Sequence, residues 1–378
     1  MSRIAYFISP HGFGHAARAA AIMAAIQELD AGMGFDIVTQ VPAWFFQDSL
    51  NGRFDYHDVC TDLGLVQHSA LNADLGASLC HLDTFLPFDT AEIARLARRL
   101  DACQLVVCDI APMGLLVAQQ LGVPSVLVEN FTWDWIYRIY VDAYPGFSRH
   151  IDYLAACFAT ASYHVQTEPV CDIRPCDLTT RPISRQPTTS PMHIRERLDV
   201  PPDVPLVLLT MGGIPESYPF VQQLTERFPE IAFVIPSGSA EPQRFGHVQL
   251  LPPRSAFFHP DLVHACDAVV GKAGYSTVSE VYAAGVPLGY ILRQSFRESA
   301  ALAAFVRQHM HGIEVPELDF QNGGWLDLIP DLLQLPKRQR QEPNGAGQAA
   351  NFVYQLVHGK RGSTVIQEKN PGFETLVV

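Results

Sequence analysis

The stretch Val269-Val-Gly-Lys-Ala-Gly-Tyr-Ser-Thr-Val-Ser-Glu280 predicts a buried strand, a glycine turn and the start of a helix that carries hydroxyls. The N-terminus of a helix offers unpaired backbone N–H groups and the positive end of a dipole, so it favours a bound phosphate. Glu280, one turn into the helix, could accept hydrogen bonds from ribose hydroxyls. The pattern indicates a nucleotide-diphosphate-sugar site. An ordinary strand–loop–helix joint capped by Ser276 or Thr277 explains it equally well.

Short apolar runs alternate with longer helical stretches on both sides of this segment. Such runs are typical of parallel strands that are buried on both faces of a sheet. Leu121-Gly-Val-Pro124 and Ala284-Gly-Val-Pro287 repeat one device, in which a helix ends at glycine and proline starts the next strand. The sequence therefore predicts an α/β fold with two doubly wound, Rossmann-like domains that face a cleft. The expected strands are 4–8, 35–38, 105–108 and 125–128, then 206–210, 232–235, 269–270 and 288–291.

A segment rich in proline and hydroxyls separates the two halves. Residues 178–191 have the composition of an interdomain linker. We therefore expect an N-terminal, acceptor-side domain over residues 1–177 and a C-terminal, nucleotide-sugar-binding domain over residues 192–340. Residues 341–378 are expected to form a C-terminal helix and a tail that is loosely held or lies on a surface.

Composition excludes several classes of function. The chain has 378 residues, of which 48% are hydrophobic and 17% charged, as in folded proteins with more than one core. The net charge of −13 argues against binding to nucleic-acid duplexes, and no apolar run is long enough for a stable membrane anchor. The eight scattered cysteines lack zinc spacing, so we expect buried thiols, no metal site and a cytoplasmic location.

His15 and Asp109 are the candidate catalytic pair. The string Ser9-Pro-His-Gly-Phe-Gly-His15 follows the first predicted strand and places His15 near a helix start, where the dipole favours a neutral imidazole. Asp109 follows strand 105–108 at the same sheet edge and could bond the other ring nitrogen, fixing the tautomer. Such a pair would deprotonate a hydroxyl without a metal. A capping or packing role is the alternative for each residue.

Aromatic and polar residues follow strand 125–128. Asn130 and Asp134 are polar at the expected cleft edge and are the better candidates for a sugar or acceptor site. Trp135 and Tyr137 could equally belong to a rigid aromatic loop that packs on its own domain.

Two further strand ends lie in the second half. Gly212-Gly213 ends strand 206–210, where backbone could meet phosphate, although this signal is weak alone. Arg293, Arg297 and Glu298 follow strand 288–291. Arginine there could neutralise a diphosphate, and Glu298 could bond sugar hydroxyls. A solvated charge at the rim is the alternative for Arg293.

Together these strings resemble the glycosyltransferases of the two-Rossmann-domain type called GT-B. Residues 248–304 are similar to the bacterial lipid-linked N-acetylglucosaminyltransferase of peptidoglycan synthesis, and Gly14-His15 with Asp109 resembles the catalytic pair of plant small-molecule glycosyltransferases. The resemblance implies that the base lies near Ser255–Phe257, the phosphates near Gly274–Thr277, and the ribose at Glu280. The donor-binding residues that it implies are Gly212, Gly213, Ser255, Phe257, Lys272, Gly274, Tyr275, Ser276, Thr277, Glu280, Arg297 and Glu298.

A closer resemblance covers nearly all of residues 1–357, to the glycosyltransferase-like amino-terminal region of L-arabinokinases. It is carried by His11-Gly-Phe-Gly-His15 with Arg18, Asp62-x-Gly-x-Val-Gln67, Asn130-Phe-x-Trp-Asp134, Gly271–Glu280 and Phe296-x-Glu298. The acceptor-binding residues that it implies are His11, Asp62, Gln67, Asn130, Trp133 and Asp134.

Two features depart from the lipid-linked enzyme. That enzyme has Gly-Gly before its histidine, where this chain has Phe13-Gly14. Trp44-Phe-Phe46 could be a membrane-facing patch as in that enzyme, but no basic residues flank it closely. A helix packed after the second strand therefore fits better.

These residues predict an inverting, metal-independent glycosyltransferase that moves a sugar from a nucleotide-diphosphate sugar, UDP-linked by preference, to a hydroxyl of a small-molecule acceptor. The nucleotide sugar is a co-substrate, and no other cofactor is expected. The alternatives are a nucleotide-sugar epimerase or hydrolase and a non-catalytic nucleotide-sugar-binding protein. A dinucleotide oxidoreductase is disfavoured, because neither glycine loop supplies Gly-x-Gly-x-x-Gly followed by a suitably spaced acid.

Overall fold

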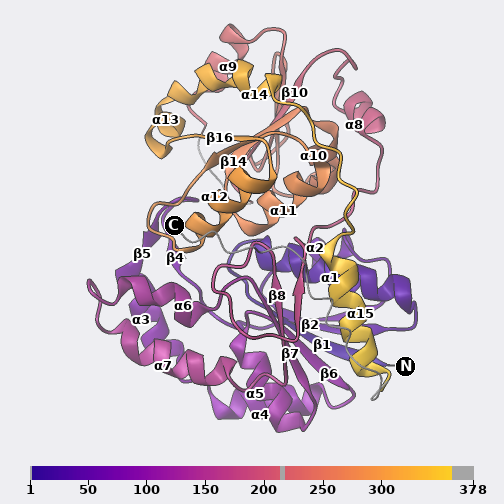
Figure 1. The fold of residues 1–378 in the computed structure, drawn as a ribbon, viewed down its shortest axis with the longest axis vertical. Coiled ribbons are helices and arrows are strands. Elements are labelled where there is room, and N and C mark those ends of the chain that lie inside the picture. The colour runs from indigo at the N-terminus through magenta and orange to yellow at the C-terminus, as the bar shows by residue number, and fades with distance from the viewer. Residues whose placement is uncertain (1, 213–217, 360–378) are drawn as a thin grey trace, which may run out of the picture.

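The computed structural model describes residues 2–212 and 218–359. These residues form two lobes, each built around a twisted seven-stranded sheet with helices on both faces (Figure 1). The predicted α/β fold with two doubly wound sheets is confirmed.

The first sheet has the strand order β3-β2-β1-β6-β7-β8-β9, and all its neighbouring strands run parallel. Its central strands are apolar runs that are buried on both faces, as predicted. The strands are β1 (Arg3–Ile8), β2 (Gly34–Thr39), β3 (Phe54–Asp58), β6 (Leu105–Asp109), β7 (Ser125–Glu129), β8 (Tyr163–Thr167) and β9 (Leu178–Thr180), and a separate short hairpin joins β4 (Val66–Gln67) to β5 (Ala73–Asp74).

Helices cover both faces of the first sheet. The longest, α1 (Gly14–Leu29), is buried along most of its length because it packs between the sheet, α15 (Gly345–Val357) and the second lobe's α11 (Tyr275–Ala284). The other helices of this lobe are α2 (Ala43–Gln47), α3 (Leu75–Phe85), α4 (Thr90–Arg99), α5 (Pro112–Leu121), α6 (Trp133–Tyr137), the 3₁₀ helix η1 (Arg138–Tyr140) and α7 (Phe147–Phe158).

The second sheet has the order β12-β13-β11-β10-β14-β15-β16 and is parallel except for β12. Its strands are β10 (Leu206–Thr210), β11 (Ala232–Pro236), β12 (Gln243–Phe245), β13 (Val248–Leu251), β14 (Ala268–Lys272), β15 (Leu288–Ile291) and β16 (Gly312–Glu314). Its helices, besides α11, are α8 (Pro191–Arg197), α9 (Val221–Arg227), α10 (His259–Ala265), α12 (Glu298–His309), α13 (Glu317–Asn322), the 3₁₀ helix η2 (Gly324–Leu328) and α14 (Ile329–Gln334).

The chain crosses between the lobes twice. It enters the second lobe after β9, which takes up the first three residues of the segment 178–191 that we interpret as a linker. It then returns to the first lobe, where α15 lies beside α1 (Figure 1). The two crossings are bonded to each other, because Asn344 Nδ2 donates to the Ser184 carbonyl over 2.7 Å and the Gly345 amide donates to the Pro182 carbonyl over 3.2 Å. Residues 360–378 of the predicted tail lie outside the described residues.

Each sheet changes its direction of winding between two central strands. In the first sheet this happens between β1 and β6, and in the second between β10 and β14. Ligands of open α/β sheets bind beyond the carboxyl ends of the strands at such switch points. His15 and Asp109 lie at the first switch point, and Gly212 and Gly274 lie at the second.

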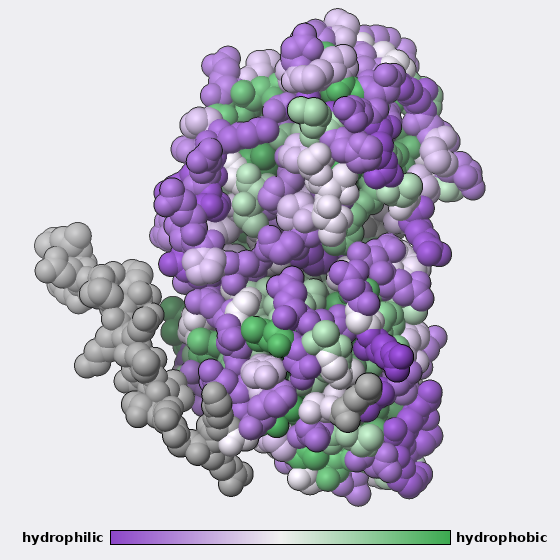
Figure 2. Space-filling view, turned by 90° about the vertical axis from the view of Figure 1, so that its right-hand side faces the viewer, coloured by the Kyte–Doolittle hydropathy of each residue, from purple (hydrophilic) through white to green (hydrophobic). Residues whose placement is uncertain are grey.

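The face of the molecule that Figure 2 presents is mainly hydrophilic. Figure 2 shows hydrophobic residues dispersed among hydrophilic ones on the face that it presents. None of the helices in this part of the chain has the length and apolar composition needed to cross a bilayer. The large hydrophobic side chains that are exposed are spread over both lobes: Leu29, Ile139, Tyr144, Ile173, Met192, Phe245 and Leu318.

Candidate active site between the two lobes

A pocket, here called the cleft pocket, lies where the two switch points meet. The start of α1 lines it from the first lobe and the start of α11 from the second. The helices approach so closely that a side-chain carbon on Gly14 would lie 3.8 Å from Ser276 Oγ. Two helix N-termini therefore direct positive potential into one space. The predicted site residues that line it are His11, His15, Gln67, Gly212, Lys272, Gly274, Tyr275, Ser276, Thr277 and Glu298.

His15 and Asp109 contact each other behind this pocket. His15 is the second residue of α1, and its Nδ1 lies 2.9 Å from Oδ1 of Asp109, the last residue of β6. With the Nδ1 hydrogen donated to Asp109, Nε2 keeps its lone pair and can accept a proton. His15 lines the pocket, whereas Asp109 is fully buried. Asp109 does not cap the next helix, because the N-cap of α5 is Ala111.

Arg18, one turn after His15 in α1, forms a fork on Asp109. Its Nε donates to Asp109 Oδ2 over 2.8 Å and its Nη2 donates to Oδ1 over 2.7 Å. Its Nη1 donates to Asn130 Oδ1 over 2.7 Å. Burial alone would raise the pKa of Asp109, but Arg18 and His15 outweigh burial and lower it. Asp109 is therefore a carboxylate in the folded protein.

The start of α11 is an anion-binding arrangement. Gly274 is its N-cap, and the first turn continues with Tyr275, Ser276 and Thr277, whose backbone N–H groups have no acceptor within the helix. Lys272, which is mostly buried, ends the preceding strand and also lines the pocket. Backbone donors and an ammonium group from adjacent positions therefore face the same space.

The two glycine signals of the second half have different roles. Gly212 has φ +74 and faces Lys272 across the pocket, so it uses the left-handed conformation that glycine allows. Gly213 lies outside the described residues. Gly271 was expected in a turn, but β14 continues through Lys272 and contains it. A side-chain carbon at Gly271 would lie 2.1 Å from the Thr210 carbonyl oxygen of β10, so this glycine serves strand packing.

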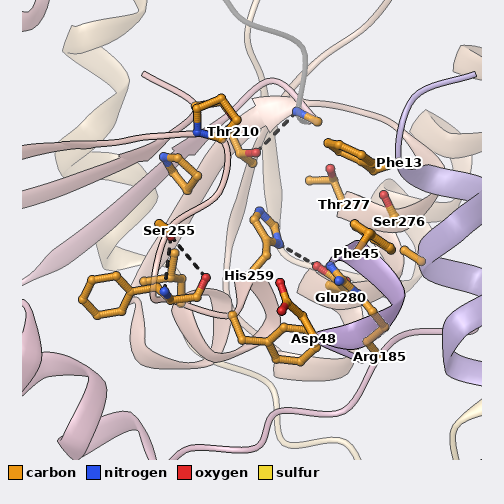
Figure 3. Close-up of a pocket in the computed structure, with 18 of the residues that line it drawn as sticks. Phe13, Phe45, Asp48, Arg185, Thr210, Ser255, His259, Ser276, Thr277 and Glu280 are labelled. Carbon is orange, nitrogen blue, oxygen red and sulfur yellow. Dashed lines mark hydrogen bonds and ion pairs between the residues drawn. The ribbon is translucent and has the colours of Figure 1, made fainter. Parts of the chain in front are cut away.

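A second pocket, here called the aromatic pocket, adjoins the cleft pocket around Glu280 (Figure 3). Arg185 Nη2 lies 3.0 Å from Glu280 Oε1, and His259 Nδ1 lies 2.7 Å from Oε2. Burial would raise the pKa of Glu280, but Arg185 and His259 lower it to about 2. Glu280 is therefore ionised and already paired, so a ribose would share this carboxylate with Arg185 and His259 or displace one of them.

Aromatic rings line the aromatic pocket from both lobes. Phe13 stacks on Phe45 of α2 with ring centroids 5.0 Å apart, and Trp44 lies beside them on the same wall. On the opposite side, the backbone amide of Phe257 donates to Ser255 Oγ over 3.2 Å in the loop after β13. Flat apolar walls with polar groups at one end suit a heteroaromatic ring. The predicted helix around Trp44-Phe-Phe46 is confirmed as α2, with Phe45 and Phe46 buried.

Only some of the predicted acceptor-side residues reach the cleft pocket. His11 and Gln67 line it. Trp133 lies behind His11, with ring centroids 5.1 Å apart. Asp62 is buried and accepts a hydrogen bond from Ser9 Oγ over 2.8 Å. Burial outweighs that bond and raises the pKa of Asp62 to about 7.

Asp134 lies apart from both pockets. It is buried and pairs with Arg138 and Arg174 at 3.4 and 3.8 Å. The packing explanation holds for Tyr137, which is buried and donates to the Gly64 carbonyl. Trp135 is also buried, and the Arg297 guanidinium from the second lobe lies 3.9 Å from its ring centroid.

Glu298, at the start of α12, faces the cleft pocket but is held by protein groups. Asn130 Nδ2 donates to its Oε1 over 2.9 Å, and Arg293 Nη2 donates to its Oε2 over 3.3 Å. Arg293 is buried against the Phe296 ring, so its interpretation as a solvated rim charge is wrong. Burial lowers the pKa of Arg293 although Glu298 opposes the shift.

Comparisons with known proteins give the architecture a name. No protein-family model matches the sequence. The chain is 27% identical over 374 residues to L-arabinokinase of Arabidopsis thaliana, an alignment that covers 94% of this chain and 34% of that protein. The chain thus spans about a third of the length of the curated relative it matches.

Similar solved structures extend along nearly the whole chain. A UDP-glucosyltransferase from Polygonum tinctorium superposes with a TM-score of 0.57 at 15% identity, covering 95% of this chain and 99% of that one. UGT89C1 of Arabidopsis thaliana, solved as a complex with UDP, gives a TM-score of 0.59 at 13% identity and covers 94% and 100%. The chain has the GT-B fold. The sequence resemblances to GT-B proteins and to L-arabinokinase are thereby confirmed.

Within this GT-B fold, sequence reasoning missed the roles of three basic residues in or behind the two pockets. Arg185 lies in the predicted linker and His259 starts α10, and both contact Glu280. Neither belongs to a recognisable string. Arg18 appeared only inside a resemblance string, although a buried arginine within the run Ala16–Ala21 could have marked it as a residue with a buried anionic partner.

Proposed function

We propose that the chain is an inverting glycosyltransferase that moves a sugar from a nucleoside-diphosphate sugar to a hydroxyl group of a small-molecule acceptor. One observation carries the proposal. The His15 imidazole, oriented by Asp109, and the N-terminus of α11 line the same cleft pocket from opposite lobes. A base and an anion site on either side of one space are what a displacement at a sugar carbon requires.

The aromatic pocket would hold the nucleoside and the cleft pocket the diphosphate and sugar. Phe257 and the stacked rings of Phe13 and Phe45 line this pocket with apolar surface for a base, and Glu280 offers a carboxylate to the ribose. We favour uridine because the chain superposes on a UDP-glucosyltransferase and on a UDP complex. The diphosphate would accept hydrogen bonds from the backbone amides of Tyr275, Ser276 and Thr277.

The reaction balances with protein groups alone. His15 Nε2 takes the proton of the acceptor hydroxyl while its oxygen attacks the anomeric carbon from the face opposite the diphosphate. A new C–O bond forms as the bond to the β-phosphate oxygen breaks, so the anomeric configuration inverts. The electron pair of the broken bond leaves with the diphosphate, whose charge would be stabilised by the α11 N-terminus and Lys272. We propose that these groups serve in place of a metal ion.

A pair of substitutions tests the proposal with a panel of UDP-sugars and small hydroxyl acceptors. His15→Ala should lower transfer by about 10²–10⁴-fold while leaving UDP affinity within a few-fold. Glu280→Ala should weaken UDP binding. His81→Ala, at an exposed histidine of α3, is the matched control. Wild-type turnover by His15→Ala would remove it as the base.

Product analysis with the donor alone separates the alternatives. An epimerase or hydrolase would consume the nucleotide sugar without an acceptor. A binding protein would raise its melting temperature with the nucleotide sugar but leave it intact with every acceptor. Either result would contradict glycosyl transfer.

A further inference from the structure

Arg18 connects the His15–Asp109 pair to the second lobe. Its fork holds both oxygens of Asp109, and its remaining nitrogen holds Asn130. Asn130 in turn donates a hydrogen bond to Glu298 of the second lobe. The face of the Arg18 guanidinium lies 4.5 Å from the ring centroid of Tyr275, the first residue of α11. Arg18 is 1% exposed, so all these contacts are made out of water, where charge balance matters most.

We propose that Arg18 is a positioning residue. Its positive charge balances the buried Asp109 carboxylate, so no proton is needed for that purpose, and the His15 imidazole stays neutral and available as a base. A fully buried carboxylate needs a compensating cation, because burying an unpaired charge is costly. Without Arg18, that cation would be a proton on His15, whose Nδ1 lies 2.9 Å from Asp109 Oδ1. The role of His15 as base rests on the function proposed above; the charge relation between the three side chains does not.

The other titratable groups around the pair do not replace Arg18. Glu298 is matched by Arg293 at 3.3 Å. Among the described residues, Arg18 is the permanently charged cation in contact with Asp109. The other groups that interact with Arg18 or Asp109 carry no positive charge: Tyr6 of β1, Cys108 of β6, Glu129 of β7, Asp62 and Tyr275 of α11. The cations Lys272 and Arg293 line the cleft pocket together with His15.

The charge balance between Arg18 and Asp109 has two opposite effects on the proposed reaction. When His15 takes the acceptor proton, the imidazolium forms beside a carboxylate whose charge Arg18 already balances. Asp109 therefore orients the ring more than it strengthens the base. In return, no proton is needed to balance the Asp109 carboxylate, so Nε2 stays available to the acceptor hydroxyl.

The test is a titration of the His15 ring by NMR in the full chain without substrate, with His15→Ala to assign the signal. Arg18→Met should raise the His15 midpoint by about one pH unit or more, equivalent to at least a tenfold gain in proton affinity. Arg18→Lys keeps the charge and should stay nearer the wild-type midpoint. Once an acceptor is known, the acid limb of kcat/KM should move in the same direction.

If Arg18→Met fails to fold, Asp109→Asn tests the same charge relation by removing the carboxylate and keeping the guanidinium. It leaves the Arg18 charge uncompensated beside the imidazole, so the His15 midpoint should fall. An unchanged midpoint in Arg18→Met, or in Asp109→Asn, would overturn the proposal and leave Arg18 a packing residue. Failure to detect sugar transfer would instead contradict the proposed function, and it would not affect the conclusion from the titration.

Discussion

Asn130 and Glu298 join the two lobes through a buried hydrogen bond, in which Asn130 Nδ2 donates to Glu298 Oε1 over 2.9 Å. Asn72 and Glu317 form a bond of the same chemistry between the lobes, 3.0 Å long but exposed to solvent. The two bonds differ in burial, and Asn130 also accepts a hydrogen bond from the buried Arg18. Comparing them measures what the buried network contributes to stability.

Asn130→Ala should lower the free energy of unfolding by roughly 1.5–3 kcal/mol, because it deprives the buried Glu298 of a donor and the buried Arg18 of an acceptor. Asn72→Ala should cost less than about 1 kcal/mol, since water replaces the lost contact. Urea denaturation of both variants at neutral pH provides the comparison. Equal losses would show that burial does not strengthen the contact at Glu298.

Glu280 should make the protein acid-sensitive. Its pKa is lowered from 4.5 to about 2 in the folded chain, so its stabilising contribution is complete above pH 4.5 and is lost as the pH falls toward 2. The contribution at neutral pH is on the order of 3 kcal/mol. Glu280→Gln should therefore be less stable than wild type at pH 6, and the gap should close toward pH 2. A gap that is independent of pH would show that the pairing with Arg185 and His259 does not carry the effect.

Asp62 should have the opposite effect. Its pKa is raised from 3.8 to about 7, so the folded chain keeps a proton that the unfolded chain releases. Stability should fall as the pH rises from about 4 to 7, by an amount on the order of 2–4 kcal/mol. Asp62→Asn removes the titration and should be more stable than wild type at pH 8 in urea denaturation. Lower stability of the variant at pH 8 would mean that the carboxylate is well solvated or paired.

Gly271→Ala should be strongly destabilising, because the new carbon would lie 2.1 Å from a backbone oxygen of the neighbouring strand and the two strands would have to separate. A loss of several kcal/mol or insoluble protein is expected. Gly347→Ala is the control, since a carbon at this position of α15 would meet nothing within 4 Å. It should stabilise by about 0.5–1 kcal/mol, through helix propensity. Similar thermal midpoints for the two variants would contradict the close approach of β14 to β10.

The central strands and the catalytic pair could be predicted because they depend on local patterns. Apolar runs such as Leu206–Thr210 became strands with the predicted bounds, and residues directly after strands meet at one sheet edge by geometry alone. His15 and Asp109 follow from that rule. Six further strands of the two sheets escaped prediction because they are short or partly polar, and their neighbours in the sheet stabilise them: β3, β8, β9, β12, β13 and β16.

The charge partners of the site could not be predicted in the same way. Glu280 was expected to face a ribose, but its partners Arg185 and His259 lie 95 and 21 residues away in the sequence. Their encounter is produced by the first crossing of the chain, which carries Arg185, and by the packing of α10 against α11. Glu298 shows the same limit, because its partner Asn130 belongs to the other lobe.

The bond between Ser184 and Asn344 fastens the two passages of the chain to each other. The lobes are therefore not held by two independent tethers. Arg185 is the next residue along the chain after Ser184, and its guanidinium pairs with Glu280. The same short segment thus ties the lobes together and places the arginine partner of the carboxylate that we propose for the ribose.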